Sequence, residues 1–222
     1  MCGRITQNLT SDEIAELFGA EDEVQSPGGR FNVAPTQNIL AVAEPDDHRV
    51  VTTYRWGLIP PWAESAKIGA QMINARSETV AEKPSFRAAL RKTRCIIPAD
   101  AFYEWQRGGA AKVPHAIVRQ DGRPLALAGL WTTWRDPATE EKVRSCTIIT
   151  TSANQTLAPI HERMPVILPD ESWDEWLDPN NSDVPALQSL LAPSPVEVVR
   201  AYRVSTLVNN VRNDSPELLV PV

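Results

Sequence analysis

FYEWQRGGAAKVPHAIVRQDGRPLALAGLWTTWRDPATEEKVRSCTIIT, residues 102–150, is the β-rich centre of this 222-residue chain. Its β-branched and aromatic residues gather in four segments, which we predict to be strands at 102–107, 113–119, 124–132 and 143–150. Turn-forming residues separate these segments: Gly108-Gly109, Asp121-Gly122 and the polar loop 135–142. Because such turns join neighbouring antiparallel strands, the stretch predicts an antiparallel meander.

The sequence on either side adds more strands and several short helices. After an N-terminal strand, further strands are predicted at 37–43, 49–56, Met164–Leu168 and 196–204. The capping-box spacing of Thr10-Ser11-Asp12-Glu13, with Gly19 as a stop, predicts a helix between them. Other helices are predicted over Pro84–Lys92 and near 170–177 and 184–192, and a loop is predicted over 20–30.

The order of these elements indicates the fold class. Helices and strands are interspersed without a regular βαβ alternation, which indicates an α+β protein. We expect a mainly antiparallel β-sheet or open barrel with short flanking helices. The length suits one substantial core, and no repeat or linker divides the chain, so a single domain over 1–222 is predicted.

Composition excludes several classes of protein. The cysteines, Cys2, Cys95 and Cys146, are odd in number and far apart, which indicates a reducing compartment and no disulfide framework. No apolar run approaches the roughly 20 residues that span a bilayer, and we see no signal peptide. Without a CxxC or HxxxH spacing or a glycine-rich phosphate loop, we expect neither a metal nor a nucleotide cofactor.

The charge balance leaves nucleic-acid binding open. The net charge of −6 argues against a generic nucleic-acid coat, but 17 of the 22 basic residues are arginine. Arginine suits bidentate contacts to phosphate and stacking on bases, although coding bias explains such a ratio equally well. A local basic cluster therefore remains compatible with binding to a phosphate chain.

The chain opens Met1-Cys2-Gly3-Arg4, so removal of the initiator methionine leaves an N-terminal cysteine. Such a residue carries an amine of pKa about 8 and a thiol of pKa about 8.5 on adjacent carbons. This pair can condense with an aldehyde, first to a Schiff base and then to a thiazolidine ring. A cysteine placed at position 2 by chance is the alternative, so the case depends on the rest of the chain.

Three further segments carry side chains suited to chemistry. If residues 73–78 form a strand, Asn74, Arg76 and Glu78 share one face, as a polar site or as a solvated sheet face. Glu104 lies within the aromatic run 102–105, which should raise its pKa and suit it to general acid–base work, unless it is an exposed edge-strand glutamate. His161 stands beside Arg163 just before a predicted strand; a surface-loop histidine is the alternative.

The other candidates are weaker. His115 and His48 are interpreted as structural or incidental. Trp56, Trp62 and Trp105 fall near loops and strand ends, where a ring could stack an unpaired base, although we expect at least two of them to be mostly buried.

Seven separated motifs, in order along nearly the whole chain, resemble the SRAP (SOS response-associated peptidase) family. They are MCGR, FNVAPT, RWGLIPPW, INARSET, IIPADAFYEW, TSAN with IHERMP, and VNNVRND. The resemblance implies a DNA damage response protein that senses abasic sites in single-stranded DNA. Departures at Ala63 and Ile5 concern a stacking contact and packing, not the chemistry.

The resemblance also implies roles for individual residues. Cys2 would attack the open-chain aldehyde of the abasic sugar and form a DNA–protein cross-link that settles as a thiazolidine. Asn74 would hold that ring, Glu104 would transfer protons, and His161 would orient the sugar or exchange protons. Arg4, Arg76 and Arg163 would contact phosphates, and the path of the strand would be lined by Asn32, Trp105, Thr150 and Asn210.

We further expect lyase activity by β-elimination and a mature chain of 2–222. We also expect a monomer with a cytoplasmic, nucleoid-associated location. Two alternatives remain open: a cysteine peptidase that uses Cys2 with Glu104 and His161, and a DNA-binding module without turnover. Replacement of Cys2 by alanine separates them, because only the cross-linking enzyme loses its adduct.

Overall fold

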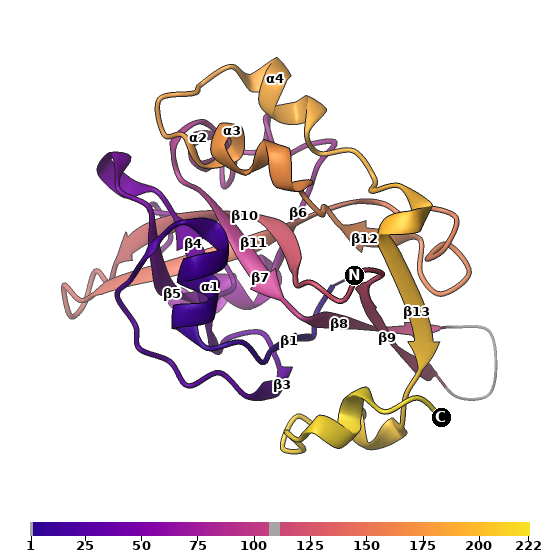
Figure 1. Ribbon diagram of the computed structural model, residues 1–222. Coiled ribbons are helices and arrows are strands. Elements are labelled where there is room, and N and C mark those ends of the chain that lie inside the picture. The colour runs from indigo at the N-terminus through magenta and orange to yellow at the C-terminus, as the bar shows by residue number, and fades with distance from the viewer. Residues whose placement is uncertain (1, 107–111) are drawn as a thin grey trace.

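A closed five-stranded barrel organises the chain, as the computed structural model shows for residues 2–106 and 112–222 (Figure 1). Its strands, in order of pairing, are β11 (Lys142–Ser152), β10 (Leu125–Arg135), β7 (Arg94–Ala99), β4 (Asn38–Ala43) and β5 (Val50–Trp56). The ring closes because β5 also pairs with β11, in parallel, through Arg55 with Ser145 and Trp56 with Cys146. The predicted α+β class with a barrel is confirmed, and the barrel is closed rather than open.

Three short strands extend the barrel sheet. β12 (Arg163–Pro165) pairs with the end of β11, and β2 (Glu21–Asp22) pairs with β5 inside the segment predicted to be a loop. β6 (Asn74–Arg76) runs parallel to β11, which places Asn74 opposite Ile148. Through β6 and β12, the barrel carries two motifs from distant parts of the sequence to one edge.

A second, antiparallel sheet packs beside the barrel. Its order is β13 (Val199–Arg203), β9 (Val113–Arg119), β8 (Ala101–Gln106), β1 (Ile5–Gln7) and β3 (Arg30–Val33). The chain passes from the barrel into this sheet at Asp100, between β7 and β8. β8 is therefore a central strand, with β1 on one side and β9 on the other.

Two apolar clusters hold the layers together, one on each face of the barrel strands. The inner cluster includes Trp56, Ile97 and Ile148 and continues onto the second sheet at Phe102. A β-carbon at Gly129 would lie 2.7 Å from the Ile97 side chain, so this narrow interior admits no larger residue there. The outer cluster lies under the helices α1 (Ser11–Phe18), α2 (Arg87–Lys92), α3 (Trp173–Leu177) and α4 (Val184–Ser189).

Local signals account for the best predicted helix. In α1, the Thr10 side chain accepts a hydrogen bond from the Glu13 amide, and the Glu13 carboxylate accepts one from the Thr10 amide. Gly19 ends the helix in the left-handed conformation, φ 62°. The capping box and the stop read from the sequence are both confirmed.

A buried arginine joins the helices to the barrel. Arg94, 2% exposed, donates to the carbonyl oxygens of Leu90 at 2.8 Å and Trp176 at 2.5 Å, and to that of Asp178. Its guanidinium also lies 5.9 Å from the centre of the Trp176 ring. Burial lowers the pKa of Arg94 to about 10. This one side chain fixes the ends of α2 and α3, which Figure 1 shows grouped with α4 on one side of the barrel.

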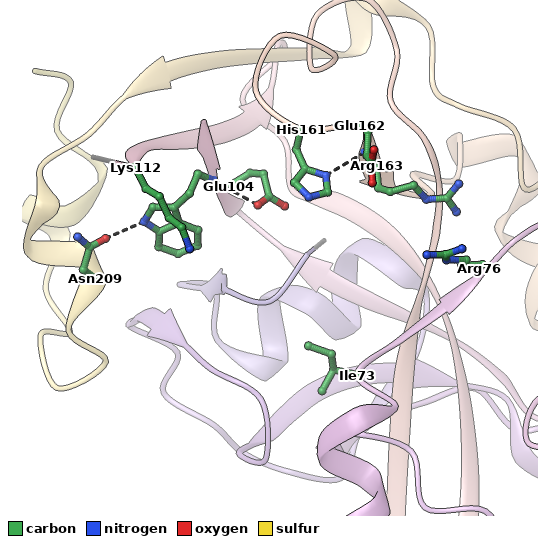
Figure 2. Close-up of a pocket in the computed structure, with 9 residues that line it drawn as sticks. Ile73, Arg76, Glu104, Lys112, His161, Glu162, Arg163 and Asn209 are labelled. Atoms are coloured by element: carbon green, nitrogen blue, oxygen red, sulfur yellow. Dashed lines mark hydrogen bonds between the residues drawn. The ribbon is translucent and has the colours of Figure 1, made fainter. Parts of the chain in front are cut away.

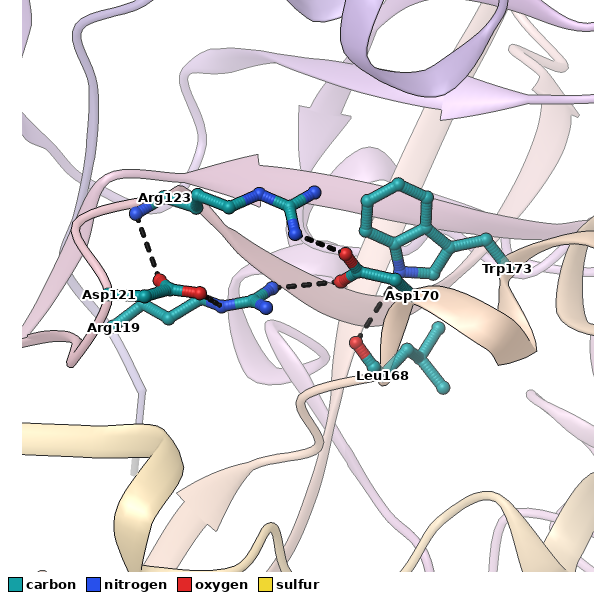
Figure 3. A network of polar contacts seen from close by, with 6 residues as sticks. All are labelled: Arg119, Asp121, Arg123, Leu168, Asp170 and Trp173. Atoms are coloured by element: carbon teal, nitrogen blue, oxygen red, sulfur yellow. Dashed lines mark hydrogen bonds and ion pairs between the residues drawn. The ribbon is translucent and has the colours of Figure 1, made fainter.

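A second polar network ties the second sheet to the segment before α3 (Figure 3). Asp170, in the 3₁₀ turn Asp170–Ser172, accepts hydrogen bonds from Arg119 at the end of β9 and from Arg123. Arg119 also pairs with Asp121 at 3.0 Å. Burial opposes ionisation of Asp170, but the two arginines outweigh it and lower its pKa.

Several predictions need correction. Residues 102–150 form two hairpins in different sheets, β8 with β9 and β10 with β11, so the predicted meander is wrong. The Asp121-Gly122 turn carries the chain from one sheet to the other, whereas Gly108-Gly109 lies outside the described residues. α2 begins at Arg87 instead of Pro84, and 196–204 starts with the 3₁₀ turn Val196–Val198. Other 3₁₀ turns are Pro45–Asp47, Ala66–Gln71, Thr206–Asn209 and Pro216–Leu219.

Candidate functional site

A cavity of about 650 Å³ opens where the second sheet meets the edge of the barrel (Figure 2). Five segments of the chain contribute to its wall. Its lining residues are Ile73, Arg76, Glu104, Trp105, Lys112, His161, Glu162, Arg163 and Asn209. Figure 2 shows Lys112 and Asn209 at one end and Arg76 with Arg163 at the other, with Glu104 and His161 between them.

Glu104 is a buried carboxylate at the centre of the cavity. It is 8% exposed, and β8 is an inner strand, so the interpretation as an exposed edge-strand glutamate is wrong. Its Oε1 accepts a hydrogen bond from the Trp105 amide at 3.2 Å. The carboxylate points toward the His161 ring in Figure 2. Proximity of a carboxylate and an imidazole is an arrangement suited to proton transfer.

His161 is oriented by its own loop. Its Nδ1 accepts a hydrogen bond from the backbone N–H of Arg163 at 2.9 Å. In the neutral ring the proton is therefore carried by Nε2. This hydrogen bond gives the neutral His161 ring a defined tautomer beside Glu104.

A bidentate ion pair borders the cavity. Arg163 places Nη1 at 2.5 Å from Oε1 of Glu78 and Nη2 at 2.9 Å from Oε2, and Nη2 also donates to the Thr150 carbonyl at 2.7 Å. The hydrogen bonds from Arg163, followed by the charges of Arg163 and Arg76, lower the pKa of Glu78 against the effect of burial. Arg76 is exposed.

Asn74 and Arg76 share one face of β6, while Ala75 is buried on the other, as the alternation predicts. The strand is shorter than 73–78, so Glu78 lies beyond it. Asn74 donates to the Ile73 carbonyl at 3.0 Å. Within the described part of the chain, its buried Oδ1 has no hydrogen-bond partner. An acceptor in this state is suited to an N–H or O–H group supplied by a ligand.

Cys2 lies behind the cavity rather than in its wall. Its side chain is 1% exposed and packs in the inner apolar cluster. Burial raises the pKa of the thiol, and the nearby charge of Glu104 raises it further. Both effects favour the neutral thiol over the thiolate.

A clamp of polar contacts holds the other end of the cavity. Arg4 Nη1 donates to Asn32 Oδ1 at 2.7 Å and to the Val208 carbonyl at 2.8 Å. Asn32 Nδ2 donates to the carbonyls of Val208, Asn210 and Asn213. The guanidinium lies 5.6 Å from the centre of the Trp105 ring, and Trp105 Nε1 donates to Asn209 Oδ1 at 2.7 Å. The clamp thus fixes the segment around Thr206–Asn209 against the second sheet.

A family model described as "SOS response associated peptidase (SRAP)" matches residues 1–211. The chain belongs to the SRAP family. The resemblance recognised from the seven motifs is thereby confirmed.

Relatives of the chain include three proteins named abasic site processing proteins. YoqW of Bacillus subtilis (strain 168) is 48% identical over 99% of both chains, and YedK of Escherichia coli (strain K12) is 34% identical over the full length of both. HMCES of Xenopus tropicalis is 33% identical, over the whole of this chain and 78% of the relative. A crystal structure of a Bacteroides thetaiotaomicron protein covers both chains completely, with a TM-score of 0.90 and 30% identity.

The structure of this SRAP chain brings five of the eleven predicted site residues into the wall of one cavity. Arg76, Glu104, Trp105, His161 and Arg163 line the cavity. Asn32 and Thr150 are buried, at 3% and 0% exposed, and hold neighbouring segments instead of lining it. Trp56 is buried in the barrel, Trp105 is mostly buried, and Trp62 is 59% exposed, which confirms the expectation for two of the three.

Sequence reasoning missed some residues of the site. Asn210 was selected from VNNVRND, whereas its neighbour Asn209 reaches the cavity and Trp105. Lys112, just before β9, carried no motif. His115, interpreted as structural or incidental, does not line the cavity and is buried opposite Glu104 in the β8–β9 register, in agreement with a structural role.

Among the described residues, no helix could span a bilayer, and no group of three His, Cys, Asp or Glu side chains could hold a metal ion.

Proposed function

We propose that this chain processes abasic sites in single-stranded DNA by linking itself covalently to them through Cys2. The observation that carries the proposal is the buried Glu104, which points toward His161 inside the cavity and lies close enough to Cys2 to raise its thiol pKa. The names of the relatives support it, since all three are abasic site processing proteins.

The chemistry follows from an N-terminal aminothiol. Removal of Met1 gives the α-amine of Cys2, which adds to the aldehyde of the ring-opened sugar and loses one water to form an imine. The thiol sulfur then adds to the imine carbon, and the thiol proton ends on the nitrogen, closing a thiazolidine. The net change is the loss of one water.

Glu104 and His161 supply the proton transfers. Because the Cys2 thiol is neutral, its attack requires a base, and the Glu104 carboxylate is the adjacent acceptor. The protonated Glu104 can return that proton to the imine nitrogen, with His161 as the second carrier. The Asn74 Oδ1 acceptor is suited to the N–H of the finished ring.

Strand cleavage is the side reaction of the same intermediate. The imine acidifies the neighbouring carbon of the sugar, and loss of a proton there expels the 3′ phosphate by β-elimination. Closure of the thiazolidine removes the imine, so the cross-link limits lyase activity and protects the strand.

The wall of the cavity supplies the contacts to DNA. We assign phosphate contacts to Arg4, Arg76 and Arg163, and we assign base stacking to Trp105. Asn32, Thr150 and Asn210 contribute by shaping the path of the strand. The proposal implies a cytoplasmic, nucleoid-associated monomer.

Intact mass measured before and after incubation with a single-stranded oligonucleotide bearing one abasic site tests the proposal. We expect a starting mass without Met1 and an adduct equal to protein plus DNA minus one water. Cys2→Ala should form no adduct, and Cys2→Ser should form only an imine that borohydride traps. An unchanged wild-type mass would overturn the covalent mechanism.

A peptidase that uses Cys2 with Glu104 and His161 is the second candidate, favoured by the description of the family. The mass of purified Cys2→Ala separates the two. An aminopeptidase removes Met1 before alanine as it does before cysteine, whereas self-processing would leave Met1 on this variant.

A further inference from the structure

Two arginines converge on one acidic residue at the end of the cavity. Arg163 holds Glu78 in a bidentate ion pair, and Arg76 is close enough for its charge to lower the pKa of Glu78 as well. Figure 2 shows the guanidinium groups of Arg163 and Arg76 on the same side of the cavity. Like charges that lie close together repel, so Glu78 reduces the repulsion in the DNA-free protein.

The two partners in this ion pair differ in how firmly they are held. The Arg163 side chain is 14% exposed and also donates to the Thr150 carbonyl, whereas the Glu78 side chain is 52% exposed. Arg163 therefore belongs to the wall, and the carboxylate lies on its solvent side. A carboxylate can leave this position without disturbing the fold of the wall.

Both terminal nitrogens of Arg163 already donate hydrogen bonds within the protein. Nη1 and Nη2 both donate to Glu78, and Nη2 donates to Thr150 as well. A guanidinium binds a phosphate with the same two-pronged geometry that it uses for a carboxylate. A phosphate that approaches Arg163 must therefore compete with Glu78 for the same N–H groups.

We propose that Glu78 is a built-in competitor for DNA phosphate: its carboxylate occupies the position on Arg163 that a backbone phosphate takes when the strand binds. This inference rests on the proposed binding of single-stranded DNA. Its consequence is selectivity. Glu78 weakens the noncovalent hold on every strand alike, so the protein is retained where Cys2 finds an aldehyde and released where it does not.

The test is binding of Glu78→Gln to an undamaged single-stranded oligonucleotide, measured by fluorescence anisotropy over a range of salt concentrations. Glutamine keeps the shape and one acceptor but removes the charge. We expect binding about fivefold tighter at low salt. The slope of log affinity against log salt should steepen by up to about 0.7, because the variant has no displaced carboxylate that binds a cation from solution when the phosphate arrives.

Two variants show whether the effect passes through Arg163. Glu162→Gln removes an exposed acid from the cavity wall that has no ion pair to an arginine within the described residues, and its gain should be clearly smaller. In an Arg163→Gln background, Glu78→Gln should gain little, since the contested N–H groups are gone. An equal gain in that background, or unchanged or weaker binding by Glu78→Gln alone, would overturn the inference.

Because this assay uses undamaged DNA, it is independent of the covalent step. Absence of an adduct between the wild-type protein and abasic DNA overturns the proposed cross-linking and leaves the Glu78 result standing. Urea unfolding midpoints of the four variants (Glu78→Gln, Glu162→Gln, Arg163→Gln and the double variant), compared with the wild type, identify any change in affinity that comes from misfolding.

Discussion

Arg94 and Arg4 show how one type of side chain serves two regions of the molecule. Both side chains are at least partly buried, and burial lowers the pKa of each guanidinium. Both also donate hydrogen bonds to backbone carbonyls. Each also lies near the face of a tryptophan, Arg94 at Trp176 and Arg4 at Trp105. One fixes helices on the barrel, and the other fixes a segment at the cavity.

The difference lies in how many donors each arginine uses. Arg94 is almost completely enclosed and commits Nε, Nη1 and Nη2 to three carbonyls. Arg4 is partly exposed and uses Nη1 for both of its hydrogen bonds. Arg94, which uses all three of its nitrogens as donors, serves stability. Arg4 has N–H groups that are not used in these hydrogen bonds and is able to bind a ligand. The following predictions test that contrast.

Arg94→Met should give the largest effect, a loss of about 3–5 kcal/mol in the free energy of unfolding. Its removal leaves three buried carbonyls without their donor. Urea unfolding at pH 7 measures the loss, and the folded fraction should bind single-stranded DNA as the wild type does. A loss below about 1 kcal/mol would contradict the role of Arg94 in holding α2 and α3 on the barrel.

Asn32→Ala should lower the free energy of unfolding by about 2 kcal/mol and also weaken DNA binding. The change removes one donor from each of the carbonyls of Val208, Asn210 and Asn213, and it loosens Asn209 against Trp105. Asn38→Ala is the matched control, because this exposed asparagine has no side-chain hydrogen bond among the described residues. Equal effects of the two substitutions would contradict the clamp.

Arg4→Gln should lower the free energy of unfolding by only about 1 kcal/mol and should weaken binding of single-stranded DNA about tenfold. Glutamine keeps one donor for Asn32 or Val208, so the segment stays in place while the charge is lost. Anisotropy titrations and urea unfolding together give the ratio of the two effects. The contrast with Arg94 is contradicted if Arg4→Gln strongly lowers the free energy of unfolding and leaves the affinity for single-stranded DNA unchanged.

Asp170→Asn tests a surface arginine network and should give the smallest effect, about 0.5 kcal/mol at pH 7, because Asp170 is a third exposed. The folded pKa of Asp170 is lowered from the usual 3.8, so its stabilisation is present above about pH 4. The wild type should therefore be more stable than Asp170→Asn at pH 7, and this difference in the free energy of unfolding should disappear as the pH falls through the lowered pKa of Asp170. Urea midpoints measured at pH 7, 4 and 2.5 check this, and a constant difference would contradict it.

The sequence predicts the fold class and most of the strands because strand signals are local. It fails on the meander because Asp121-Gly122 indicates a reversal of the chain but not the sheet that the next strand joins. That choice depends on contacts between residues far apart, such as Arg55 with Ser145. Such pairings leave no local pattern in a single sequence.

The site is predictable only in part. The local sequence pattern selected Glu104, His161 and Arg76, and resemblance to the SRAP motifs gave them roles; they lie far apart in the chain and meet in the cavity. It selected Asn210, although the 3₁₀ turn Thr206–Asn209 presents Asn209 instead, because the direction of a side chain in a short turn depends on its backbone angles. The role of Asn32 as a clamp was equally hidden, since the three carbonyls to which it donates lie more than 170 residues away.

β11 pairs with four strands, β10, β12, β5 and β6, and this has a consequence for the order of folding. Its parallel partners β5 and β6 come much earlier in the chain, so loops of about 90 and about 70 residues must close before these pairs form. Closure of the barrel and placement of Asn74 are therefore late events that occur together. Under the proposed mechanism, a nascent chain that ends before β11 carries Cys2 without the arrangement that would make it an efficient trap. The proposed reactive centre would therefore form only in a completed molecule.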